Sequence, residues 1–173
     1  MFFARLFVTL HPDLRNIMEV VHKVLPNNEI LRDLIQLVNE GQRVVLPVKG
    51  NSMLPFIIGG RESVELVKPE TVAVGDVVLA WINGCRFVVH RIIRIEGDKV
   101  QLMGDGNLTD DEYCLMTDVK ARAEYVIAPN GKRRYLYTDT RLRLSRLWRR
   151  LLPVRRWILA IYRRSLLKLN IHL

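Results

Sequence analysis

The sequence predicts a mainly β fold, α+β overall, and three observations carry that prediction. Between residues 42 and 128 short apolar runs are rich in Val, Ile and Leu, which favour strands. Gly, Asn and Asp turns separate these runs, and helical spacing of apolar residues is confined to the two ends. The 173 residues are 49% apolar and 26% charged, a composition that can bury a core. Strands this closely spaced indicate a sandwich or a coiled sheet rather than βαβ units.

Six strands are expected in the central region, which we delimit as residues 42–131. They are predicted at 43–48, 62–67, 76–82, 86–95, 98–103 and 119–127. Asn83-Gly84 and Gly97-Asp98 are typical two-residue hairpin turns. Residues 1–41 form an N-terminal segment with two short helices expected, separated at 26–28 and ended by Gly41.

The last segment, residues 132–173, differs from the rest in charge. It carries 13 basic residues and one acidic residue, a net charge of +12, whereas residues 1–131 carry 14 basic and 17 acidic residues, a net charge of −3. Leucines recur at helical spacing from Leu142 to Leu152, Pro153 interrupts the pattern, and a second basic amphipathic helix begins near Trp157. The whole-chain charge of +9 therefore says little about the central region.

Three roles are open for this basic segment. The leucines could dock on the body, or the arginines and tryptophans could bind an anionic membrane surface or nucleic acid. Two apolar stripes interleaved with tryptophans favour a membrane over nucleic acid. The residues expected at such a contact are Trp148, Arg149, Arg150, Arg155, Arg156 and Trp157.

Several classes of protein are excluded or disfavoured. Cys85 and Cys114 cannot form a disulfide framework; two buried free thiols are expected, with a single disulfide as the alternative. No run reaches the roughly 18 apolar residues of a membrane span, and the N-terminus has no small-residue cleavage site of a signal peptide. The acidic turn at 104–111 does not follow the EF-hand pattern, so we expect no metal and no cofactor.

Three segments place reactive side chains where chemistry can occur. Ser52 lies between Gly50 and Pro55 directly after a strand, where a hydroxyl can be presented beside free backbone N–H groups. His90 lies within a strand, and imidazole is the side chain best suited to accept a proton near neutral pH. The acidic turn could supply a carboxylate that orients the histidine. Each segment alone is more typical of ordinary structure.

In combination these segments resemble the superfamily of signal peptidase I and repressor-type self-cleaving serine peptidases. The resemblance rests on four ordered motifs: GNSMLP at 50–55, GDVV at 75–78, VHR at 89–91 and GDGNLTDD at 104–111. It covers roughly residues 43–127 and implies a coiled β-sheet catalytic core. Histidine stands where bacterial signal peptidases and repressors have lysine, which resembles the endoplasmic-reticulum, archaeal and sporulation-type enzymes.

The resemblance implies roles for individual residues. Ser52 would be the nucleophile and His90 the general base, with Asp111, or else Asp105, as the supporting carboxylate. The backbone N–H groups of Ser52 and Met53 would form the oxyanion hole.

The function expected from these motifs is a serine endopeptidase that cleaves a peptide or precursor. Because no transmembrane anchor is seen, we expect a cytoplasmic protein or one peripheral to the cytoplasmic membrane face. One alternative is a non-catalytic β scaffold whose basic segment binds a membrane surface or nucleic acid. A second alternative is a self-cleaving repressor-like regulator, although the N-terminal helices are short for a DNA-binding domain.

Overall fold

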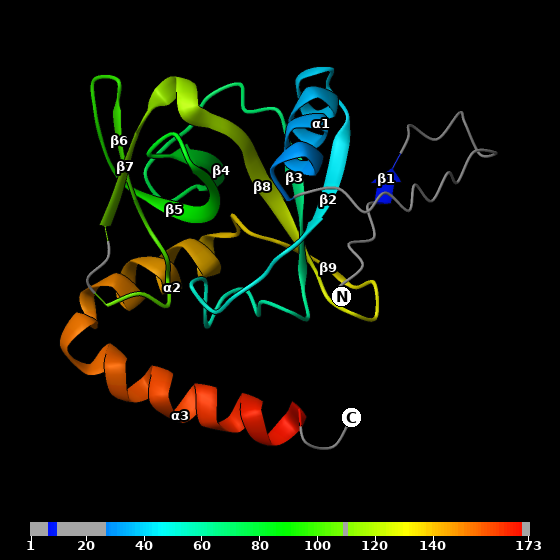
Figure 1. Cartoon of the computed structure of the whole chain (residues 1–173). Helices are drawn as coiled ribbons and strands as arrows, with labels where there is room; N and C mark the ends of the chain where they lie inside the picture. The colour runs from blue at the N-terminus through cyan, green and yellow to red at the C-terminus, as the bar shows by residue number, and fades with distance from the viewer. Residues whose placement is uncertain (1–6, 10–26, 109–110, 171–173) are drawn as a thin grey trace.

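A computed structural model describes residues 7–9, 27–108 and 111–170 and shows a mostly antiparallel β protein, as the sequence predicts (Figure 1). The strands are β1 (Phe7–Thr9), β2 (Arg43–Pro47), β3 (Ser63–Val67), β4 (Val77–Ile82), β5 (Arg86–Glu96), β6 (Lys99–Met103), β7 (Asp111–Leu115), β8 (Val119–Ile127) and β9 (Arg133–Tyr135). Their order in the sheet is β1-β2-β3-β8-β4-β5-β6-β7, and β9 pairs with β8.

Strand β8 joins the two halves of the sheet. Its C-terminal part pairs with β3 and its N-terminal part with β4, and Arg122 pairs with both strands. One apolar cluster fills the β2, β3 and β8 half and includes Val44, Leu66 and Ala123. A second cluster lies inside the coil of β4 to β7 and includes Ile92 and Leu102. The predicted coiled sheet is thus built around two adjacent cores.

Helix α1 (Asn27–Asn39) covers the first core and corresponds to the second of the two predicted N-terminal helices. Leu34 and Val38, four residues apart on one helical face, are completely buried. Gly41 follows the helix with a φ of +86°, a conformation that favours glycine at a helix end. The other predicted helix falls on residues 10–26, outside the described residues.

Strands β1, β7 and β9 were not anticipated from the sequence. In β7 only Cys114 is buried, and the strand begins with two acidic residues, so it lacks a repeating apolar signal. It pairs with β6 along one side only and forms an edge of the sheet. Both cysteines are free thiols, as expected, but only Cys114 is buried, and Cys85 is exposed, contrary to the expectation of two buried thiols.

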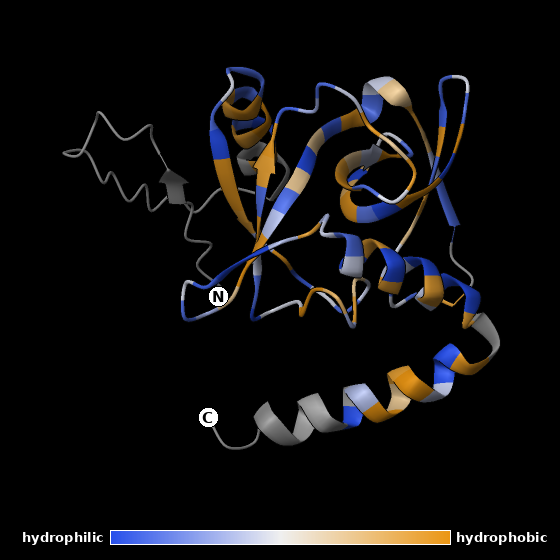
Figure 2. Ribbon diagram, turned by 180° about the vertical axis from the view of Figure 1, so that it is seen from behind, coloured by the Kyte–Doolittle hydropathy of each residue, from blue (hydrophilic) through white to orange (hydrophobic). Residues whose placement is uncertain are grey.

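The basic segment forms two helices, α2 (Asp139–Arg150) and α3 (Leu152–Asn170), on either side of Leu151. The Thr138 hydroxyl accepts a hydrogen bond from the Arg141 N–H and caps α2. Both helices lie along one side of the β body, and in each of them apolar and charged residues alternate (Figures 1 and 2). Among the described residues no helix is long and apolar enough to cross a membrane.

Candidate active site

Ser52 lies in the loop between β2 and β3. Buried neighbouring residues and close backbone packing hold this loop in place. The next two residues, Met53 and Leu54, are buried, whereas Ser52 itself is only half-buried. Gly50 adopts a φ of +75°, and Gly59 packs so closely on it that a Cβ at position 59 would overlap the Gly50 carbonyl. The loop is therefore held at both ends, and Ser52 remains accessible from solvent.

A second loop, residues 104–106, presses against the Ser52 loop backbone to backbone. The Gly106 N–H donates a hydrogen bond of 2.6 Å to the Ser52 carbonyl. A Cβ at Gly104 would lie 2.5 Å from that same carbonyl oxygen, and one at Gly106 would lie 2.5 Å from the Asn51 oxygen. Glycine is required at both positions because any side chain would push the two loops apart. This contact explains the GDG motif on physical grounds.

Two backbone N–H groups, those of Ser52 and Met53, are the candidate oxyanion donors in this loop. Within the described part of the chain, neither the Ser52 N–H nor the Met53 N–H donates a hydrogen bond, whereas the Leu54 N–H is bonded to Asn51. Free N–H groups beside a nucleophile are what an oxyanion hole requires. The geometry is thus compatible with the predicted use of these two groups.

His90 is buried in β5 and is paired with Glu112 of β7. Its Nδ1 lies 2.7 Å from Glu112 Oε2, and the His90 residue is only 5% exposed. Arg86, on the same face of β5, binds the other oxygen of the carboxylate. Glu112 therefore accepts from both side chains. A donor at Nδ1 leaves Nε2 of the imidazole as the nitrogen that can accept a proton.

Burial lowers the pKa of His90 below its ordinary value of 6.5, and the Glu112 carboxylate raises it in part. Desolvation is the larger of the two influences on the His90 pKa. It lowers the pKa because burial penalises the charged imidazolium. The net direction is downward, so His90 is neutral near pH 7. A neutral imidazole is the form that can act as a general base.

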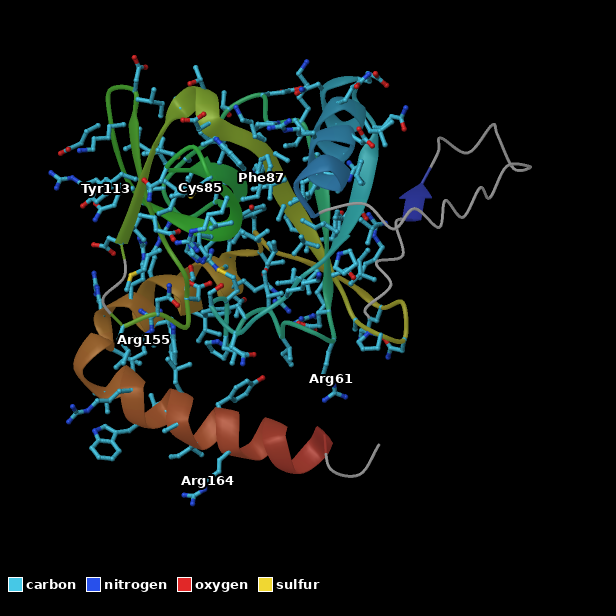
Figure 3. All side chains as sticks on the ribbon, viewed as in Figure 1. Arg61, Cys85, Phe87, Tyr113, Arg155 and Arg164 are labelled. Atoms are coloured by element: carbon cyan, nitrogen blue, oxygen red, sulfur yellow. The ribbon has the colours of Figure 1, made fainter. Side chains whose placement is uncertain are left out.

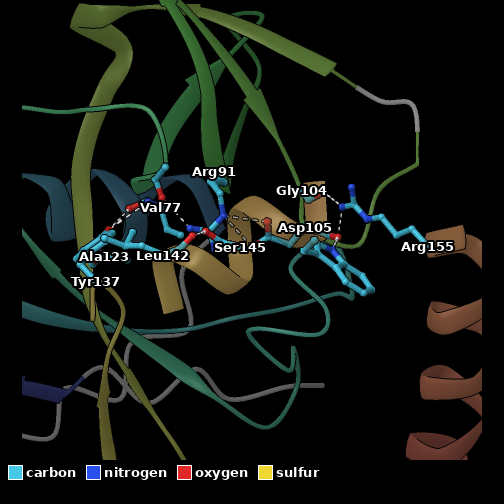
Figure 4. A network of polar contacts seen from close by, with 11 residues as sticks. Val77, Arg91, Gly104, Asp105, Ala123, Tyr137, Leu142, Ser145 and Arg155 are labelled. Carbon is cyan, nitrogen blue, oxygen red and sulfur yellow. Dashed lines mark hydrogen bonds and ion pairs between the residues drawn. The ribbon is translucent and has the colours of Figure 1, made fainter. Parts of the chain in front are cut away.

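Arg91, the next residue, faces the opposite side of β5. Its guanidinium is buried, donates to both carboxylate oxygens of Asp105 at 2.6–3.1 Å and donates to the Gly75 carbonyl at 2.7 Å (Figure 4). It also lies 5.5 Å from the centre of the Phe56 ring. Asp105 is thus engaged in a buried ion pair that ties the 104–106 loop to β5.

The structure corrects the expected partner of His90. Successive residues of a strand point to opposite faces, and the register aligns Arg91, Met103 and Asp111 on one face. His90 and Glu112 share the other face. Asp111 is exposed and accepts a hydrogen bond from Gln101, and Asp105 binds Arg91, as described above. Neither Asp111 nor Asp105 hydrogen-bonds to His90, and Glu112 occupies the place predicted for them.

The 104–106 loop relates the position of Ser52 to that of His90. Arg91 pairs with Met103, so continuing the register by one residue puts Gly104 opposite His90. By strand alternation Gly104 faces the same side as His90, and what lies there is the backbone of Ser52. The structure shows no hydrogen bond between the two side chains in the residues it describes. Such bonds commonly tighten only when substrate is bound.

Helices α2 and α3 complete the surroundings of Ser52. Trp148 Nε1 donates a 2.7 Å hydrogen bond to the Asp105 carbonyl, and Arg155 donates to the Gly104 and Asp105 carbonyls. Leu54 packs in an apolar cluster with Trp148 and Leu159. Figures 3 and 4 show Arg155 reaching from α3 toward the body.

This docking changes the set of residues expected at a membrane. Trp148 and Arg155 are 7% and 1% exposed, so they face the body and are inaccessible to a partner. Arg149 is half-buried, and Arg150, Arg156 and Trp157 are exposed. One face of the basic segment, residues 132–173, therefore docks on the body, which is the first of the three roles considered for it.

A coiled β core that carries a serine loop beside a buried histidine defines a protein of the repressor-type serine peptidase superfamily, which is related to signal peptidase I. Residues 19–126 match the Peptidase S24-like family, and the chain belongs to that family. The match spans both loops, β5 and β7. No curated protein matches the chain.

Proposed function

We propose that this protein is a serine endopeptidase of the signal-peptidase-like kind, with Ser52 as nucleophile, His90 as general base and Glu112 as the carboxylate that orients His90. The observation that carries the proposal is the buried His90–Glu112 pair, with Nδ1 and Oε2 2.7 Å apart. A histidine held this way has a fixed tautomer, in which Nε2 is the nitrogen that can accept a proton. The family contains serine peptidases, and the half-buried Ser52 supplies a hydroxyl next to free N–H groups.

The proposed reaction proceeds in two halves. Ser52 Oγ bonds to the carbonyl carbon of a peptide while its proton passes to His90 Nε2, and the oxyanion is held by the N–H groups of Ser52 and Met53. The C–N bond then breaks as Nε2 returns the proton to the leaving amine. Water then bonds to the carbonyl carbon of the acyl-enzyme while one of its protons passes to Nε2. The bond between that carbon and Ser52 Oγ breaks, Nε2 returns the proton to Oγ, and the peptide acid leaves. Glu112 stabilises the imidazolium in both halves.

The test uses the full chain and a library of peptides digested in its presence and analysed by mass spectrometry. Ser52→Ala and His90→Ala are each expected to abolish cleavage while circular dichroism and melting remain close to those of the wild-type protein. A His90→Ala protein that cleaves at the wild-type rate would refute the mechanism.

The same samples distinguish a peptidase acting on other chains from a self-cleaving regulator. We expect the intact mass of the purified wild-type protein to stay constant while added peptides are cut. Loss of mass in the wild-type protein but not in Ser52→Ala, with added peptides untouched, would instead support self-cleavage. No cleavage of either kind would favour a non-catalytic scaffold.

A further inference from the structure

Helix α3 has two apolar faces, and among the residues that the structure describes only one of them is docked on the body. The docked face carries Arg155 and Leu159, which are 1% and 2% exposed. The other face carries Val154, Trp157 and Ile158, which are 48%, 61% and 38% exposed. These three follow the i, i+3, i+4 spacing of a single helical stripe, and exposed Ile161 continues it at i+7. An exposed tryptophan within such a stripe is not accounted for by packing.

The surroundings of this outer stripe are uniformly basic. Arg156 and Arg164 of α3 and Arg146 and Arg150 of α2 are exposed. In Figure 3 Arg164 projects from α3 away from the β body. After Asp139 the sequence contains ten basic residues and no acidic one. The outer surface of the two helices thus carries positive charge. The acidic residue of these helices is Asp139, in the first turn of α2.

We propose that the outer stripe of α3 binds the surface of an anionic lipid membrane. Val154, Trp157 and Ile158 would enter the boundary between headgroups and acyl chains, and the exposed arginines would contact lipid phosphates. Charge complementarity selects the anionic surface, and the apolar stripe selects lipid over nucleic acid, because phosphate binding alone does not use exposed Trp and Ile side chains. The helix would lie along the surface, since it cannot span the membrane.

The geometry also fixes how the peptidase would sit. The docked face of α3 contacts the Ser52 and 104–106 loops, and the outer stripe lies roughly 120° further round the same helix, given 3.6 residues per turn. A protein bound through this stripe would therefore keep the docked contacts of Trp148 and Arg155. Of the contact residues expected from the sequence, Arg150, Arg156 and Trp157 remain in this set, whereas the docked Trp148 and Arg155 and the half-buried Arg149 do not. Val154, Ile158, Arg146 and Arg164 are added.

The experiment is vesicle flotation of the full chain, with phosphatidylcholine vesicles compared with vesicles that also contain phosphatidylglycerol. We expect flotation with the anionic vesicles only, with a blue shift of tryptophan emission, and weaker flotation at high salt. The double variant Val154→Ser/Trp157→Ser is expected to lower the partition coefficient about tenfold, because it removes apolar area from the stripe. Both positions are exposed, so the variant should fold, which its melting curve checks.

The matched control is Leu115→Ser on β7, an equally exposed apolar residue (56%) away from α3. Its flotation should equal that of the wild-type protein. Equal flotation of the wild-type protein and the Val154→Ser/Trp157→Ser variant would overturn the proposal. So would absence of flotation with anionic vesicles, dimerisation lost in the same variant, or tight binding of duplex DNA in place of vesicles. Because peptide cleavage is measured separately without vesicles, failure here leaves the proposed peptidase function untouched.

Discussion

Replacing Glu112 by Gln removes a negative charge beside His90 but keeps a side-chain oxygen that can accept the hydrogen bond from Nδ1. In the wild-type protein His90 Nδ1 and Glu112 Oε2 are 2.7 Å apart. The charge matters when His90 becomes an imidazolium in the transition state. Two unit charges about 4 Å apart in an effective dielectric of about 20 interact by about 4 kcal/mol. A loss of that size lowers the rate by about 10³-fold. Arg86 shares the carboxylate and already offsets part of this attraction, so the expected loss is about 10²- to 10³-fold.

The measurement is kcat/KM on a peptide found in the library digestion, as a function of pH. Glu112→Gln should lower the plateau and also move the acid limb to lower pH, because Glu112 raises the His90 pKa. Asp111→Asn is the matched control, since it changes the neighbouring residue on the opposite face of the same strand. A large loss in Asp111→Asn with little change in Glu112→Gln would refute the assignment and restore the carboxylate expected from the sequence.

Two further outcomes are expected. Activity of the wild-type protein should fall to half at a pH below 6.5, because burial lowers the pKa of His90 and its protonated form cannot accept a proton; a midpoint above 6.5 would contradict this. Asp105→Asn should lower the free energy of unfolding by about 3 kcal/mol in urea denaturation, since it leaves the buried Arg91 charge uncompensated. A loss of less than about 1 kcal/mol would mean that the pair contributes little.

The central strands were predictable because their signal is local. Segments such as β4 (VVLAWI) and β5 (RFVVHRIIRIE) combine β-branched residues with glycine turns, and hairpin chemistry fixes their pairing. Strand β7 carries no comparable signal. Only one of its five residues is buried, and its pairing with β6 supplies the hydrogen bonds and the register that keep this edge strand in place. Its existence depends on a partner strand, which a local pattern does not reveal.

The site was predictable where chemistry is tied to a local motif and not where it depends on register. Ser52 and His90 became candidates through their turn and strand context, and the resemblance of four ordered motifs, which include the GDG glycines, suggested their roles. Glu112 was missed because the choice between adjacent carboxylates depends on which face of β7 each one occupies. Recognising 111–115 as a strand aligned with β6 would have placed Glu112, and not Asp111, on the face of His90.

The hydrogen bonds from Trp148 and Arg155 have a practical consequence for how the protein is divided. A chain cut at the sequence boundary near residue 131 would leave the Gly104 and Asp105 carbonyls without these donors and would uncover the apolar Leu54. The carbonyl of Ser52 is only one further hydrogen bond away, through the Gly106 N–H. The smallest unit to express that keeps these contacts therefore extends at least through Leu159, and the matched family segment alone would lack them.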